Sequence, residues 1–184
     1  MNQRNCSKKL KQYYADNKIK RSDDLKKHIS FSKTGLTSCS FKAPFLFIKY
    51  IIKSHRYNVY EREKHISTIL NKFDWYPTLL YADDINKTLI FRNVGIPLTN
   101  KNKPKNLKIQ FKKILSDMKS VNVKHNDIKH GEILINENGK IFLCDFGWAS
   151  INDDFGCGIK IYNGSKPSNI FCDKNALKRL ELIK

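Results

Sequence analysis

The chain has 184 residues, of which 40% are hydrophobic and 28% charged, and a formal net charge of +18. This length suits one domain or two small lobes around one cleft, and no apolar run approaches the roughly 20 residues that a membrane span needs. The polar, basic start lacks the apolar segment of a secretory signal. Five scattered cysteines without metal-ligand spacing indicate reduced thiols. We therefore expect a cytoplasmic protein that does not enter a membrane.

The first half of the chain is expected to be a basic arm followed by a sheet and a helix. Residues 1–27 are rich in Lys, Asn and Gln and predict a partly ordered arm. Apolar residues near helical spacing predict a helix over 59–73. Alternating or continuous apolar residues predict five strands, at 29–32, 39–42, 45–52, 79–82 and 88–91.

The second half begins with a polar linker at 99–106 and a helix predicted over 107–121, with its apolar residues on one face. Two apolar runs joined by a turn at 136–140 then predict a β-hairpin. A polar loop containing Asp127 precedes the hairpin and Asp145 follows it, so both carboxylates are expected at one end of a two-stranded ribbon. Residues 151–172 are expected to be a flexible loop, and a last helix is predicted over 174–182.

The segments that flank this hairpin are His125-Asn126-Asp127-Ile128-Lys129 and Asp145-Phe146-Gly147. They resemble the H-R-D-L-K catalytic loop and the D-F-G motif of the protein-kinase superfamily, in the expected order and at about the expected separation. The resemblance implies an α+β, kinase-like fold with two lobes. The N-lobe, at 28–95, would hold an antiparallel sheet, and a truncated, mainly helical C-lobe would occupy 96–184, with 1–27 as the N-terminal arm.

The resemblance also implies ATP and Mg²⁺ as cofactors and a serine/threonine-type catalytic loop. Asp127 would orient the attacking hydroxyl, and Lys129 would meet the γ-phosphate. Asp145 would bind Mg²⁺, and Glu132 occupies the position of the second metal ligand.

Nucleotide contacts are implied for the N-lobe and the hinge. Lys49 resembles the lysine that contacts the α- and β-phosphates and pairs with a helical glutamate, which would be Glu63, or alternatively Glu61. A lysine snorkelling from an edge strand is the structural alternative for Lys49. Gly35 would lie in the loop over the phosphates, and Arg92–Gly95 would be the hinge. The residues expected near the adenine are Phe91, Asn93 and Val94.

Three departures from the family pattern bear on function. The phosphate loop keeps only Gly35 of its glycines, Glu132 replaces an asparagine, and Asn126 replaces the arginine that reads a phosphorylated activation loop. No A-P-E motif follows Gly147, so most of the platform that grips peptide substrates is expected to be missing. In size the chain is more similar to trimmed, atypical kinases such as the RIO group.

The first functional hypothesis is an ATP- and Mg²⁺-dependent phosphotransferase, a minimal serine/threonine protein kinase with a protein substrate. The alternatives are a pseudokinase scaffold with weak nucleotide binding and a small-molecule kinase on the same fold. The charge of +18 is typical of proteins that attract nucleic acid. Lysines spread along the whole chain instead favour a compositional bias, so a nucleic-acid partner rests on charge alone.

Overall fold

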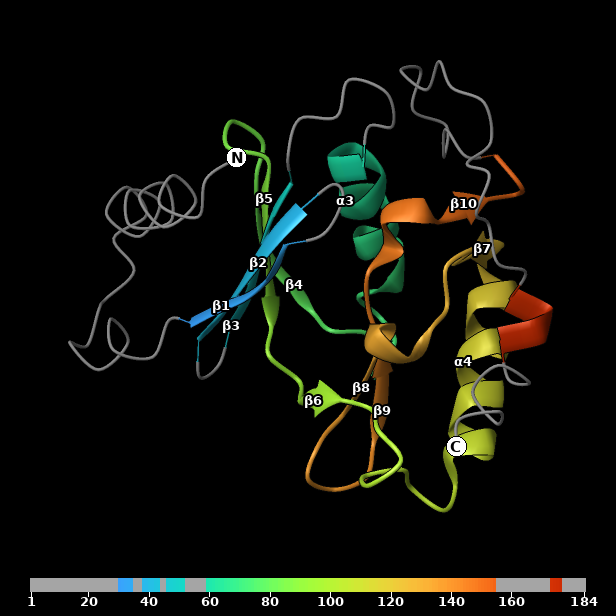
Figure 1. The fold of residues 1–184 in the computed structure, drawn as a ribbon. Coiled ribbons are helices and arrows are strands. Elements are labelled where there is room, and N and C mark those ends of the chain that lie inside the picture. The colour runs from blue at the N-terminus through green and yellow to red at the C-terminus, as the bar shows by residue number, and fades with distance from the viewer. Residues whose placement is uncertain (1–29, 35–37, 44–45, 52–58, 155–172, 177–184) are drawn as a thin grey trace. The chain divides into compact units, whose positions relative to one another are not determined.

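The computed structural model describes residues 30–34, 38–43, 46–51, 59–154 and 173–176 (Figure 1). They form a mixed α and β structure with antiparallel strand pairs, in two compact units. The first unit contains the described residues up to 51 and Leu80–Asn93, and the second contains the remainder. The predicted arm, Gly35 and nearly all of the predicted loop and last helix after 154 lie outside the described residues.

The first unit is a five-stranded sheet in the order β1-β2-β3-β5-β4. Its strands are β1 (Ser30–Thr34), β2 (Ser38–Ala43), β3 (Leu46–Ile51), β4 (Leu79–Asp83) and β5 (Thr88–Arg92). All five predicted strands are confirmed, with ends that differ by at most two residues. The apolar side chains of Ile48, Leu89 and Ile90 are buried in this sheet. β3 has a partner strand on each side, so it is an interior strand.

The second unit begins with helix α3 (Val59–Leu70), which was predicted to continue to residue 73. The helix ends earlier because Asn71 folds back on the chain. Its side-chain amide donates to the Leu79 carbonyl at 3.1 Å and accepts from the Leu79 amide at 2.9 Å. These two bonds satisfy the backbone at the start of β4, and a helix continued through Asn71 would lose them.

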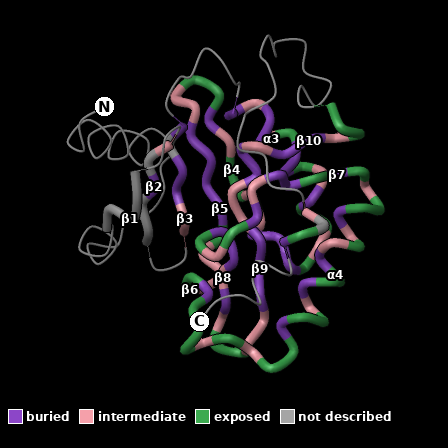
Figure 2. The backbone as a smooth tube through the Cα atoms, turned by 45° about the vertical axis from the view of Figure 1, so that its right-hand side comes forward, coloured by how far each residue is buried: buried purple, intermediate pink, exposed green. Residues whose placement is uncertain are grey.

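The remainder of the second unit packs short strands against one long helix. Helix α4 (Leu107–Ser120) buries Leu107, Phe111, Ile114 and Met118, as its periodicity predicts. The strands are β6 (Ile96–Pro97), β7 (Val123–Lys124), β8 (Ile133–Ile135), β9 (Ile141–Leu143) and β10 (Ser150–Ile151). They pair in the order β6-β8-β9, and β7 pairs with β10. In Figure 2 most of β8 and β9 and one side of α4 are buried, whereas the other side of α4 is exposed.

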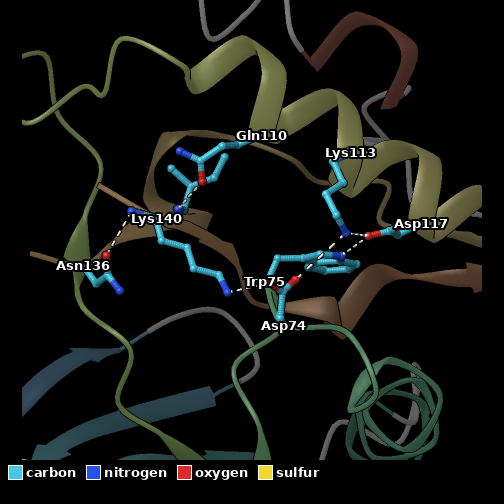
Figure 3. A network of polar contacts seen from close by, with 8 residues as sticks. Asp74, Trp75, Gln110, Lys113, Asp117, Asn136 and Lys140 are labelled. Atoms are coloured by element: carbon cyan, nitrogen blue, oxygen red, sulfur yellow. Dashed lines mark hydrogen bonds and ion pairs between the residues drawn. The ribbon is translucent and has the colours of Figure 1, made fainter. Parts of the chain in front are cut away.

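Side chains of α4 bind the hairpin and also Trp75, which follows helix α3 (Figure 3). Gln110 accepts a hydrogen bond from the Ile141 amide at 3.0 Å and donates one to the Gly139 carbonyl at 2.8 Å. Asp117 accepts from the indole nitrogen of Trp75 at 2.8 Å and from Lys113 at 2.6 Å. The bonds of Gln110 join the hairpin to α4, and the bond of Asp117 joins Trp75 to the same helix. None of the described helices is long and apolar enough to cross a bilayer.

Candidate functional site

The β8–β9 hairpin brings the two predicted motifs to one end of a ribbon. Its register pairs Ile133 with Leu143 at the end where the chain enters β8 and leaves β9. The loop with Asp127 leads into that end, and Asp145 follows Leu143 after one residue. The hairpin confirms the two predicted strands. Its register places the segments that contain Asp127 and Asp145 at the same end of the ribbon.

Lys129 joins two carboxylates in the loop before the hairpin. Its ammonium nitrogen lies 2.7 Å from Oδ2 of Asp127 and 3.4 Å from Oε1 of Glu132. Half of the Lys129 side chain is exposed, at 52%, whereas the side chains of Asp127 and Glu132 are only 14% and 6% exposed. Two largely buried acids therefore share one cation that reaches solvent.

The pKa of Lys129 reflects these two acids. Partial burial lowers it, but the hydrogen bond and charge of Asp127, followed by those of Glu132, outweigh burial and raise the pKa of Lys129 above its ordinary value of 10.5. Lys129 is therefore a cation throughout the neutral range.

His125 holds the loop in place as a neutral imidazole. Its Nδ1 accepts the Asp127 amide at 3.2 Å, so its Nε2 carries the proton and donates to the Cys144 carbonyl at 2.9 Å. Burial lowers the pKa of His125 despite the opposing charge of Asp173. The ring thus links the loop of Asp127 to the residue that precedes Asp145.

The carboxylate of Asp173 accepts two backbone amides of the same loop. It binds the amide of His125 at 2.7 Å and the amide of Asn126 at 3.0 Å, using one oxygen for each. Asn126 has the left-handed backbone angle φ 65°, a conformation that asparagine adopts more readily than most residues. Asp173 was not predicted, because a single aspartate 48 residues after His125 has no local sequence signal.

Asn126, which stands where the kinase resemblance would place an arginine, makes structural contacts. It is buried, and its amide donates to the Trp148 carbonyl at 3.1 Å and to Oγ of Ser150 at 3.0 Å. Asn126 therefore has a role of its own in the fold. The short amide takes up a role that an arginine side chain would be too long to fill, binding the loop to the segment after Gly147.

The Asp145-Phe146-Gly147 turn is packed against helix α3. Asp145 has φ 65° and ψ 65°, and the ring of Phe146, fully buried, lies 4.5 Å from the ring of His125 and 5.5 Å from that of Tyr76. Arg62 donates to the Gly147 carbonyl at 2.7 Å. The turn is therefore held by α3 through a residue that the sequence reading did not select.

Gly147 also locates Glu63. A Cβ added at Gly147 would lie 3.1 Å from Cγ1 of Val59, 3.4 Å from Oδ1 of Asp145 and 3.9 Å from Oε2 of Glu63. Within the second unit, the carboxylate of Glu63 thus faces the turn. Glu63 is buried, at 2% exposure, whereas Glu61 is half-buried. This burial favours Glu63 over Glu61 as a functional acid.

The predicted nucleotide residues of the first unit lie on its central strands. Lys49 is buried on β3, opposite Ser40 and Leu89. Because β3 is interior, the alternative of a lysine snorkelling from an edge strand is wrong. Phe91 is buried on β5. Asn93 and Val94 are half-buried, and the first unit ends at Asn93 where the second resumes at Val94.

The donor set for a metal is sparse. Within the part of the chain that the structure describes, no group of three or more His, Cys, Asp or Glu side chains is placed to hold a metal. Mg²⁺ is commonly bound by one or two carboxylates, and waters and substrate phosphates complete its shell. Asp145 and Glu132 fit that mode by chemistry. Lys129 already binds Glu132, so a metal would share that carboxylate with an ammonium.

Comparison of the chain with protein-family models and with curated proteins finds no match.

Proposed function

We propose that this protein is an ATP- and Mg²⁺-dependent phosphotransferase with a two-lobed, kinase-like fold, and that it acts as a minimal serine/threonine protein kinase. The observation that carries the proposal is the ammonium of Lys129 bound to both Asp127 and Glu132 beside the hairpin that leads to Asp145. A phosphoryl transfer site needs an acid to orient the attacking hydroxyl and cations to stabilise the phosphate charge.

The arrangement of the elements supports the same proposal. Lys49 is buried on the third strand of an antiparallel sheet, and a helix with the buried acid Glu63 follows in the chain. Lysine is rarely this buried unless it is paired, so the position of Lys49 in the sheet, at 5% exposure, fits the phosphate-binding lysine that the resemblance implies. The boundary of the two compact units falls between Asn93 and Val94, inside the proposed hinge.

In the proposed reaction, Asp127 accepts a hydrogen bond from the acceptor hydroxyl and aligns it with the γ-phosphate. Lys129 binds the transferred phosphoryl oxygens, and its raised pKa keeps it charged as it does so. Asp145, with Glu132, would hold Mg²⁺, which neutralises the phosphate charges when bound. Lys49 would bind the α- and β-phosphates.

The second candidate is a pseudokinase scaffold with weak nucleotide binding. It is favoured by the engagement of Glu132, because a carboxylate that is 6% exposed and bound to Lys129 is a poor free ligand. A small-molecule kinase on the same fold would use the same residues as the protein kinase. The two enzyme candidates differ only in the phosphate acceptor.

The first test is thermal melting with ATP, with and without Mg²⁺, on the wild type and Asp145→Asn. ATP at about 100 times its dissociation constant should stabilise the wild type by roughly 2.7 kcal/mol, or roughly 5–10 °C in Tm. We expect this shift to need Mg²⁺ in the wild type and to be lost in Asp145→Asn. Asp153→Asn, a change of the same charge at an exposed position, is the matched control and should behave as the wild type.

Transfer of labelled phosphate from ATP to casein, or to the chain itself, then separates enzyme from scaffold. We expect transfer by the wild type and by Asp153→Asn, and none by Asp145→Asn. Full transfer by Asp145→Asn would refute the metal assignment. A Tm shift without any transfer would favour the scaffold, and no shift under any condition would refute nucleotide binding.

A further inference from the structure

One segment of the second unit, residues 101–120, is rich in lysine. Residues 101–120 contain seven lysines and a single acid, Asp117, which Lys113 and the indole of Trp75 already bind. The other six lysines are all exposed, and we refer to them as the basic surface: Lys101, Lys103, Lys105, Lys108, Lys112 and Lys119. With seven lysines and one acid, the segment carries a formal net charge of +6.

Helix geometry aligns part of this surface. With 3.6 residues per turn, Lys108, Lys112 and Lys119 fall within about 40° of one another around the axis of α4. They extend along about 16 Å of the helix, from its first turn to its last. The centre of the buried face of α4 lies about a quarter turn from Lys108 and farther from Lys112 and Lys119, so the three lysines form one exposed row.

The segment before α4 lies against the same hairpin turn as the helix. Lys101, Lys103 and Lys105 precede the helix, and Pro104 lies 3.8 Å from the position of a Cβ on Gly139 in the hairpin turn. Gln110 binds the same turn from α4. The segment and the helix are thus joined to one hairpin, which sets the spacing of their lysines in advance.

We propose that the basic surface binds the phosphate backbone of a nucleic acid. A membrane would require an exposed apolar helix face, but the apolar face of α4 is buried in the core. An acidic protein partner would require apolar or aromatic anchors, and Ile109 is the only large apolar side chain exposed on α4. A row of lysines without such anchors matches the regularly spaced phosphates of a nucleic-acid backbone. Binding of this kind needs no contacts to the bases.

The test measures binding as a function of salt by fluorescence anisotropy, using labelled duplexes of about 20 base pairs with two unrelated sequences. The variant Lys112→Gln with Lys119→Gln removes two members of the row. Its control, Lys72→Gln with Lys124→Gln, removes the same charge from exposed positions elsewhere in the second unit. Each lost phosphate contact lowers the slope of log K against log salt by about 0.9.

We expect the double row variant to lower that slope by about 2 and to weaken binding roughly 60-fold at 0.1 M salt, equally for both sequences. In the control variant, the slope of log K against log salt should fall by less than a third of that amount. Equal losses in the two double variants would overturn the proposal, as would competition by polyglutamate as effective as that by unlabelled duplex. If the row variant does not fold, Lys101→Gln with Lys105→Gln gives the same test outside the helix. Asp145→Asn should bind the duplex normally, so this result is independent of the proposed activity.

Discussion

Replacing Asp173 tests whether a distant carboxylate holds the loop that contains His125 and Asn126 in shape. In Asp173→Ala, the amides of His125 and Asn126 lose an acceptor at 2.7 and 3.0 Å, and both of these residues are buried. Hydrogen bonds to a charged acceptor contribute about 1.5–3 kcal/mol each. Because Asp173 is partly exposed, we take the lower end and expect the free energy of unfolding to fall by about 3 kcal/mol. Urea unfolding followed by circular dichroism measures this change.

Two further variants make the Asp173 result specific. Asp173→Asn keeps one acceptor oxygen and should lose about half as much, roughly 1.5 kcal/mol. Asp153→Asn removes an exposed charge that binds Lys124, and such surface pairs contribute at most about 1 kcal/mol. Asn also suits the left-handed backbone at this position, φ 64°. A loss in Asp173→Ala no larger than that in Asp153→Asn would refute the reasoning. It would mean that the loop keeps its conformation without the two hydrogen bonds.

Two more predictions concern the backbone and pH. Gly95→Ala should cost at least about 2 kcal/mol in urea unfolding, because φ is +152° and the new Cβ would lie 2.2 Å from the Ile135 carbonyl oxygen. Gly131→Ala has nothing within 4 Å and should be nearly neutral, so similar losses in the two variants would contradict the close approach. Burial lowers the pKa of His125, so the unfolded chain takes up this proton first and stability should fall as the pH drops below about 6.5, by at most about 1.4 kcal/mol per pH unit. His125→Gln should reduce that slope, and an equal reduction in the exposed His65→Gln would argue against the assignment.

The elements with strong local patterns could be predicted from the sequence. Helix α4 follows from its apolar period, and the β8–β9 hairpin follows from two apolar runs around a polar turn. Lys49 also stood out locally, because a single charge inside a long apolar run is costly to bury. In these cases neighbouring residues alone determine the structure.

The residues that could not be predicted act through contacts between distant segments. Arg62 reaches the carbonyl of Gly147, 85 residues later, and Asp173 reaches the loop of His125 from 48 residues away. The early end of α3 at Leu70 depends on bonds between Asn71 and Leu79 that no helical period reveals. One sequence cannot indicate such pairs, because each partner is an ordinary polar residue in its own segment.

The side chain of Gln110 has a consequence for how this protein avoids aggregation. The order β6-β8-β9 leaves β9 at the end of its sheet, where free backbone groups invite pairing with another chain. The side-chain amide of Gln110 accepts a hydrogen bond from the Ile141 amide and donates one to the Gly139 carbonyl, as a short piece of neighbouring strand would. The Trp75 carbonyl accepts a hydrogen bond from the Leu143 amide at 3.4 Å. One glutamine and one loop carbonyl thus close an edge that could otherwise recruit a second copy.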